Sequence, residues 1–326
     1  MDKLVSIIVL NWNGFKYVFD CIESVLNQTY KNIEIILVDN QSTDSSIEEL
    51  QKRYPRLHYV LNNSNVGFAE GMNIGLSKAK GTYVMALNMD VCLENDAIEN
   101  FVNEFEKQPN VGAMMGKEFL WTDNGLIKFP TLSSGPGFLK KRGQGYFEKE
   151  LIDKKTFSFG AMGSFPIFRI TALKELFDVT GYYYDPKFET GWEDKDLFFR
   201  LHHLGWKFLY VPAVIGYHAG SGSVGEKHKL IDKTISYQTR IFRNRYFFIF
   251  KNYSFSLLLH HSIYLIITEF LIPIYYLFIS PKSIIALVKG QLLFIIDFRK
   301  IIIDRKKIQK KSKLNYKELL FFFKKF

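Results

Sequence analysis

The segment YVMALNMD, residues 83–90, is an apolar run that ends abruptly in an amide and a carboxylate. A short apolar run bounded by turn residues is typical of a buried strand. Ligands of α/β sheets bind outside the carboxyl ends of the strands. Asn88 and Asp90 are two residues apart and face the same side of an extended backbone. The pair suits a hard divalent cation and a phosphate, although an isolated N-x-D is also a common turn.

The sequence on both sides of this segment alternates between strand and helix patterns. We expect strands over residues 5–10, 33–38, 57–61, 83–87 and 111–115, and helices over 15–26, 45–54, 71–80 and 97–107. This alternation predicts a mostly parallel α/β sheet covered by helices on both faces. Residues 116–156 are rich in Gly and Pro and predict loops or a hairpin near the site. A helix over 193–204 and closing strands over 208–211 and 214–217 follow.

The excess of positive over negative charge lies entirely in the C-terminal quarter of the chain. Residues 240–326 contain 17 Lys/Arg and 4 Asp/Glu, whereas residues 1–239 contain 26 and 29. The basic residues are interleaved with long aliphatic runs, which favours an anionic membrane surface as partner over nucleic acid. The apolar run 257–279 is long enough to span a bilayer, but its polar residues and Pro273 favour interfacial helices followed by the basic segment 299–313.

These features predict two parts, an α/β domain over 1–239 and a helical membrane-associating tail over 240–326. Two cysteines provide no disulfide framework and suit a reducing cytosol. The first apolar run is too short and too quickly followed by polar residues for a signal peptide. We therefore expect a peripheral or monotopic protein on the cytoplasmic face of the cell membrane.

Four polar clusters follow predicted strands, and each has a simple structural explanation when taken alone. They are NWNG (11–14), DNQSTD (39–44), NVGFAEGMN (65–73) and NMD (88–90). Asn-Gly forms turns and Asp44 is a candidate helix cap. Their joint position at one edge of a single sheet is what indicates a binding site.

Together these motifs resemble the family 2 glycosyltransferases with the GT-A fold. The resemblance covers about residues 3–225 and rests on VSIIVLNWN (5–13), LVDNQSTD (37–44), NVGFAEGMNIG (65–75), LNMD (87–90) and GWEDKDLFFRL (191–201). The 65–75 motif is most similar to the rhamnosyltransferase-like branch. The resemblance implies an inverting transfer of a sugar from a nucleoside-diphosphate sugar to a hydroxyl of a glycan or lipid-linked acceptor.

The resemblance also implies roles for individual residues. Asp39 would bind the base or ribose, and Asp90 would hold Mg²⁺ or Mn²⁺ against the diphosphate. His218 would contact the same metal or the diphosphate, with Ser221 and Ser223 bonding phosphate. The other residues assigned to the nucleotide-sugar pocket are Asn11, Asn13, Asn65, Gly67, Asn73 and Asn88.

The acidic pair Glu193-Asp194 stands at the start of a predicted helix, where the helix dipole favours anions. The resemblance implies that an Asp of this motif is the general base, which we assign to Asp194, with Glu193 as the alternative. Asp196 would face away and pair with Arg200. His202 and His203 lie within the helix and are interpreted as structural.

Two other functions are compatible with parts of this pattern. A sugar nucleotidyltransferase needs a Gly-rich loop with Arg and Lys after the first strand, where this chain has NWNG at 11–14. A non-catalytic membrane scaffold would be expected to lose the acidic residues, which are all present. No P-loop motif is found, so ATP-type phosphate binding is not supported.

Overall fold

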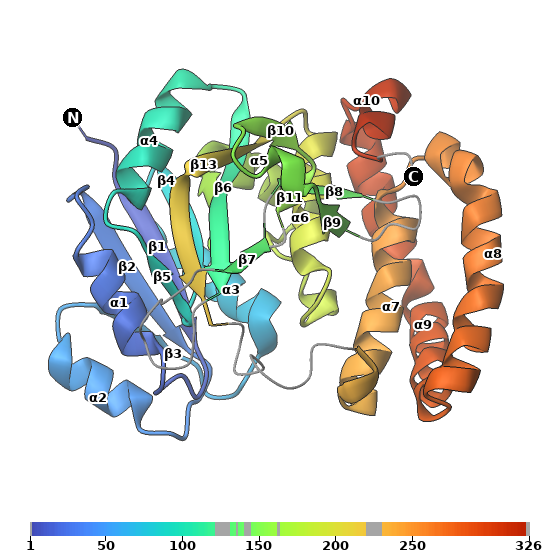
Figure 1. Ribbon diagram of the computed structural model, residues 1–326, viewed down its shortest axis with the longest axis horizontal. Helices are drawn as coiled ribbons and strands as arrows, with labels where there is room; N and C mark the ends of the chain where they lie inside the picture. The colour runs from blue at the N-terminus through green and yellow to red at the C-terminus, as the bar shows by residue number, and fades with distance from the viewer. Residues whose placement is uncertain are drawn as a thin grey trace.

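The computed structural model describes residues 2–120, 131–134, 136–139, 145–161, 164–219 and 230–323. Within them, ten strands form one sheet in the order β10-β13-β6-β12-β4-β1-β2-β3, with β5 paired to β13 and β7 to β6. A second sheet has the order β11-β8-β9. Figure 1 shows α1 and α2 beside β1–β3 at one end of the molecule and the C-terminal helices at the other.

The strands are β1 (Val5–Asn11), β2 (Ile33–Asp39), β3 (His58–Leu61), β4 (Tyr83–Asn88), β5 (Val91–Leu93), β6 (Val111–Leu120), β7 (Thr131–Ser134), β8 (Pro136–Leu139), β9 (Gly145–Phe147), β10 (Thr156–Ser158), β11 (Gly160–Ala161), β12 (Ile167–Arg169) and β13 (Lys207–His218). The α-helices are α1 (Val18–Leu26), α2 (Ser46–Arg53), α3 (Gly67–Lys78), α4 (Ala97–Lys107), α5 (Ile170–Thr180), α6 (Glu193–His203), α7 (Ile235–Asn252), α8 (Phe255–Ile279), α9 (Lys282–Lys311) and α10 (Tyr316–Phe321).

The predicted βα alternation is confirmed, because all five expected strands form and β1 pairs in parallel with both β2 and β4. Two expectations need correction. The closing strands predicted at 208–211 and 214–217 are one strand, β13, whose register shifts between Tyr210 and Ile215. The sequence analysis also missed β5, which follows Asp90 directly and pairs with the end of β13.

Strand register brings the predicted polar clusters to one edge of the sheet. Asn11 at the end of β1 is the partner of Asp39 at the end of β2. On the other side of β1, Leu10 is the partner of Asn88 at the end of β4. The three strands are parallel, so their carboxyl ends form a single rim, which is where α/β sheets bind ligands.

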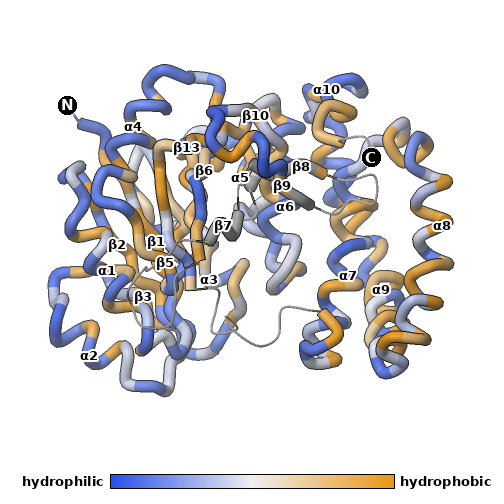
Figure 2. The backbone as a smooth tube through the Cα atoms, viewed as in Figure 1, coloured by the Kyte–Doolittle hydropathy of each residue, from blue (hydrophilic) through white to orange (hydrophobic). Residues whose placement is uncertain are grey.

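Helix α7 crosses the predicted domain boundary between residues 239 and 240. It begins at Ile235, and its buried residues extend from Gln238 to Asn252. Beyond it, α8 is one continuous helix that contains Pro273. Figure 1 places α8 at the outer edge of the molecule, and Figure 2 shows hydrophobic residues along much of its length. Within the described residues α8 is the one helix long and apolar enough to cross a membrane.

A buried ionic network joins α7 to α6. The ammonium group of Lys251 lies 2.7 Å from Asp185 Oδ2 and 2.9 Å from Asp196 Oδ2, and all three side chains are fully buried. Asp196 also accepts hydrogen bonds from Arg200 Nε at 2.7 Å and Asn252 Nδ2 at 2.8 Å. The predicted Asp196–Arg200 pair is therefore confirmed as part of a larger network.

Replacement of Lys251 by Met should destabilise the protein by about 3–5 kcal/mol, because Asp185 and Asp196 would then be buried without their shared counter-ion. Lys300→Met is the matched control, since Lys300 pairs with Asp297 at 2.7 Å but its side chain is 66% exposed. The control should change the free energy of unfolding by about 1 kcal/mol or less. Chemical denaturation of both variants measures this, and equal losses would contradict a structural role for the buried network.

Candidate active site

Asn11 holds Asp39 in place at the rim of the sheet. Its amide Nδ2 lies 2.9 Å from Asp39 Oδ1, 3.0 Å from Ser42 Oγ and 2.9 Å from Ser46 Oγ. Asp39 also accepts hydrogen bonds from the backbone N–H of Ser42 at 2.9 Å and from its hydroxyl at 2.6 Å. Both Asn11 and Asp39 are buried. These bonds fix the Asp39 carboxylate at the end of β2.

Asn13 fixes the loop after β2 from the opposite side. It adopts a left-handed backbone with φ of 52°, which Asn tolerates better than most residues. Its side-chain oxygen accepts a hydrogen bond from Thr43 N–H at 2.8 Å, and its own N–H donates to Ser42 Oγ at 2.9 Å. Asn13 therefore shapes the loop that carries Asp39.

The segment before α3 forms a second wall. Asn65 Oδ1 accepts the N–H of Gly67 at 2.9 Å, and Gly67 has a φ of +82° that favours glycine. Asn73 lies elsewhere, because its amide exchanges two hydrogen bonds of 2.8 and 2.9 Å with the backbone of Tyr184. Asn73 thus ties α3 to the segment that leads into α6.

A cavity of about 590 Å³ opens at this rim. It is lined by residues from six parts of the chain: Leu10, Trp12, Asn40, Asn65, Val66, Gly67, Phe68, Asn88, Met89, Asp90, Glu189, Thr190 and Arg240. The predicted residues Asn65, Gly67, Asn88 and Asp90 therefore meet around one cavity. Asn11, Asn13 and Asp39 support its rim, and Asn73 does not line it.

Asp90 and His218 are adjacent in space although they are far apart in sequence. The pairing of β5 with β13 sets His218 Nε2 at 3.2 Å from Asp90 Oδ1 and its Nδ1 at 3.4 Å from Glu118 Oε1. Burial alone would lower the pKa of His218, but the two carboxylates outweigh it and raise the pKa to about 10. Glu118 is itself held by Ser164, whose N–H and hydroxyl donate to Oε2 at 3.2 and 2.8 Å.

The sequence analysis missed Glu118. The sequence feature that could have indicated Glu118 is its position as an acidic residue inside the largely apolar strand β6, since a buried charge requires a partner. Glu118 is 3% exposed, and its position against Nδ1 leaves Nε2 of His218 directed at Asp90. Proteins commonly orient a metal-binding imidazole with a carboxylate that contacts the ring nitrogen not bound to the metal.

The residues at this point fit a divalent cation. A carboxylate oxygen and an imidazole nitrogen are ligands that Mn²⁺ accepts, and carboxylates also suit Mg²⁺. Within the described part of the chain, no group of three or more His, Cys, Asp or Glu side chains could hold a metal ion by itself. A cation at Asp90 and His218 would therefore need further ligands from substrate phosphates.

The acidic pair Glu193-Asp194 opens α6, three residues beyond the cavity residue Thr190. Glu193 is 7% exposed, and among the described residues its Oε2 has no hydrogen-bond partner. Burial raises the pKa of Glu193, and repulsion from Asp194 raises it further. Burial also raises the pKa of Asp194, while Lys195 lowers it in part. Carboxylates with raised pKa values are suited to accept a proton near neutral pH.

His202 and His203 are structural, as predicted. His202 Nε2 contacts the carbonyl of Phe159 at 2.7 Å, and His203 Nε2 contacts that of Asn252 at 2.8 Å. Burial lowers the pKa of each to about 4. Both therefore stay neutral and anchor α6 to its neighbours. Ser221 and Ser223 lie outside the described residues.

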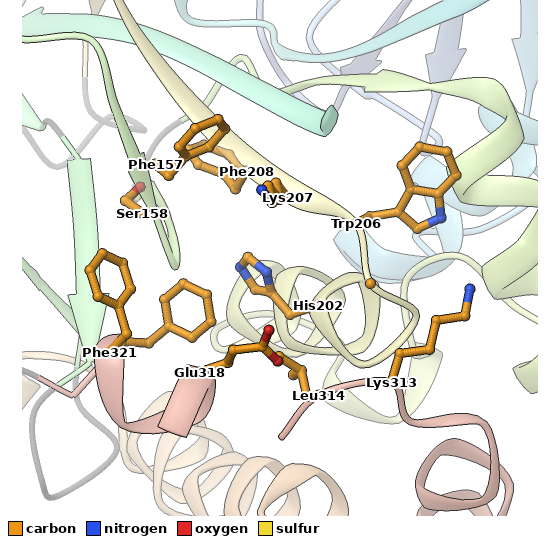
Figure 3. Close-up of a pocket in the computed structure, with 12 residues that line it drawn as sticks. Phe157, Ser158, His202, Trp206, Lys207, Phe208, Lys313, Leu314, Glu318 and Phe321 are labelled. Atoms are coloured by element: carbon orange, nitrogen blue, oxygen red, sulfur yellow. The ribbon is translucent and has the colours of Figure 1, made fainter. Parts of the chain in front are cut away.

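A second cavity of about 380 Å³ lies between β13 and α10. Figure 3 shows the rings of Phe157, Phe208 and Phe321 around it. Its polar side chains already bond to protein groups, since Glu318 caps α10 and Lys313 pairs with Glu175 at 3.1 Å. We therefore place the candidate site at the rim of the main sheet.

Comparison with known proteins finds a family match and relatives for part of the chain. The family model described as "Glycosyl transferase family 2" matches residues 6–177. Glycosyltransferase GlyG of Streptococcus pneumoniae is 35% identical over 111 residues, which cover 33% of this chain and 37% of that protein. Chondroitin synthase of Escherichia coli is 36% identical over 107 residues, covering 32% of this chain and 16% of that protein. The chain thus spans 37% of the length of the first relative and 16% of the length of the second.

Two solved structures share the fold at 16% sequence identity. GalNAc-T7 with UDP, GalNAc and Mn²⁺ aligns with a TM-score of 0.57 over 76% of this chain and 47% of that one. S. aureus TarS 1–349 aligns with a TM-score of 0.55 over 94% of this chain and 90% of that one. The expected GT-A fold is confirmed.

Proposed function

We propose that this chain, which belongs to glycosyl transferase family 2, transfers a sugar from a nucleoside-diphosphate sugar to a hydroxyl of a glycan or lipid-linked glycan. The observation that carries this proposal is the convergence of Asn65, Gly67, Asn88 and Asp90 on one cavity. The acidic pair Glu193-Asp194 begins three residues beyond the cavity residue Thr190. The 65–75 motif favours a deoxysugar such as rhamnose as the transferred group.

The donor would lie in the cavity with its nucleoside toward Asp39 and its diphosphate toward Asp90. Asp90 and His218 would hold Mg²⁺ or Mn²⁺, and Glu118 would orient His218. The cation, when bound, neutralises charge that develops on the departing diphosphate. The solved structure of GalNAc-T7 with UDP and Mn²⁺ supports this proposal.

The transfer would be a single displacement with inversion at the anomeric carbon. Asp194 takes the proton of the acceptor hydroxyl while the acceptor oxygen bonds to the anomeric carbon. The bond from that carbon to the diphosphate oxygen breaks, and the nucleoside diphosphate leaves with its electron pair. The partial burial of Asp194 supports this role, because it raises the pKa and makes Asp194 a stronger proton acceptor than an ordinary carboxylate.

Asp194→Asn should lower kcat by about 10²–10⁴-fold, because the amide cannot accept the proton, while donor affinity changes little. The wild-type kcat should rise with pH as Asp194 loses its proton. The residual kcat of the variant should not show this rise with pH. Steady-state kinetics with a matched Glu193→Gln variant measure both effects. Wild-type turnover by Asp194→Asn would refute the assignment, and a larger loss in Glu193→Gln would move it to Glu193.

Asp90→Asn should abolish the Mn²⁺-dependent part of stabilisation by the cognate donor, since a ligand that binds the folded state raises its melting temperature by mass action. Thermal shift with UDP-, dTDP- and GDP-sugars, with and without Mn²⁺, identifies that donor first. Asp297→Asn, on α9, is the control. An Mn²⁺-dependent shift that persists in Asp90→Asn would remove Asp90 from the proposed metal site.

We also propose that α8 and α9 bind the cytoplasmic face of an anionic membrane. Phe270 is 69% exposed and Phe278 is 79% exposed on α8, and Ile296 is 73% exposed on α9. These residues belong to a series of exposed large apolar side chains on α8 and α9, and extensive apolar patches are rare on the surface of monomeric soluble proteins. The basic last third of α9 adjoins this surface and would attract anionic lipid headgroups. An acceptor linked to a lipid would then be presented at the same membrane.

The full chain should co-sediment with vesicles that contain phosphatidylglycerol, and less with vesicles of phosphatidylcholine alone. The double variant Phe270→Glu/Phe278→Glu should reduce binding about tenfold or more, because charged side chains resist burial in hydrocarbon. Leu26→Glu is the control, since Leu26 is 46% exposed on α1, away from this surface. Equal loss in the control, or none in the double variant, would contradict the proposal.

A further inference from the structure

One wall of the cavity comes from a helix that lies outside the residues matched by the family model. Arg240 on α7 lines the cavity together with Glu189 and Thr190, and Asn88 and Asp90 line it as well. The matched region ends at residue 177, and the sequence analysis assigned residue 240 to the membrane tail. We propose that Arg240 binds the diphosphate of the nucleotide donor, an inference that rests on the proposed function.

The guanidinium of Arg240 has donors to spare. Arg240 Nη1 lies 3.4 Å from Glu189 Oε2, a long hydrogen bond. Its Nε is buried and has no hydrogen-bond partner among the described residues. The side chain is 32% exposed. A guanidinium carries five N–H donors, so Arg240 can bind a ligand without giving up its contact with Glu189.

Glu189 does not require Arg240 as its counter-ion. Arg243 Nη2 lies 3.0 Å from Glu189 Oε1 and also donates to the carbonyl of Lys187 at 2.7 Å. The Arg243 side chain is 10% exposed, so this pair is the better shielded of the two. The long contact between Glu189 and Arg240 therefore positions the second guanidinium at the cavity and is weak enough to be shared with a ligand.

The wall that carries Glu189 is rigid. Asn244 Nδ2 donates to the carbonyls of Phe188, Thr190 and Gly191 at 2.7, 3.2 and 2.8 Å. Glu189 itself has a φ of +58°, a backbone conformation that costs energy for a residue with a Cβ and that concentrates at functional sites. The backbone that carries Glu189, the residue in contact with Arg240, is therefore fixed before any ligand binds.

The acidic side chains that line the cavity would repel a diphosphate unless positively charged groups offset them. The two acidic side chains that line it are Asp90 and Glu189, which would both repel an anionic ligand, and Arg240 is the basic residue in its described lining. The planar guanidinium matches the spacing of phosphate oxygens and bonds to them at two points. Arg240 would thus approach the diphosphate from α7, while a cation at Asp90 approaches it from the strand ends.

The test compares nucleoside diphosphates with monophosphates by isothermal titration calorimetry on the full chain at constant Mn²⁺. UDP, dTDP and GDP are titrated into the wild type, and the tightest is then paired with its own monophosphate. Arg240→Gln should weaken the diphosphate about tenfold or more, as expected for a lost hydrogen bond to a charged group. The monophosphate should change by about twofold or less. Arg240→Lys should recover part of the loss, because it keeps the charge without the planar fork.

Arg53→Gln is the matched control, since Arg53 pairs with Glu49 on the surface of α2 with its side chain 51% exposed. It should leave both affinities unchanged. Unchanged diphosphate affinity in Arg240→Gln, or equal losses for diphosphate and monophosphate, would overturn the assignment of Arg240. Failure of all three diphosphates to bind the wild type would instead overturn the proposed donor class, and this inference with it.

Discussion

A buried ammonium group is stable in a protein only where carboxylates surround it, and Lys251 meets this condition where α6, α7 and the segment before α6 come together. Its contacts with Asp185 and Asp196 fix α7 against the start of α6. Two groups depend on this contact. The pair Glu193-Asp194 stands at the first turn of α6, and Arg240 reaches the cavity from α7. The helix that opens the predicted tail is therefore packed against the part of the molecule that carries the candidate site.

The strand-end part of the site could be predicted because it depends on local patterns alone. Buried parallel strands are continuous apolar runs, and their carboxyl ends must share one edge. The polar residues that follow β1, β2 and β4 were therefore placed together before their register was known. Pattern does not reveal which side chains face the cavity. Asn73 is of a residue type that often binds ligands, but its side-chain amide is hydrogen-bonded to the backbone of Tyr184.

The parts that could not be predicted involve contacts between distant segments. Glu118 reaches His218 only because β6 and β13 pair across about a hundred residues. Residues 240–252 are basic and aromatic, a composition that also fits a membrane surface. Three of their charges are instead directed inward, because Arg243, Arg245 and Lys251 are buried and each pairs with a carboxylate. Composition reports the number of charges in a segment, and only packing reports which of them face solvent.

The same distinction explains how α8 can be apolar and still contain polar residues. His261 and Thr268 are buried, and Glu269 bonds to Arg245 at 2.5 Å and to the hydroxyl of Tyr246, both on α7. The polar side of α8 is thus bound to protein and its other sides are apolar and exposed. A helix that spans a bilayer alone would expose Glu269 to hydrocarbon, at considerable cost. For the membrane binding that we propose, a helix held on one side by α7 and α9 would avoid that cost by entering the membrane interface sideways, in a monotopic rather than a spanning arrangement.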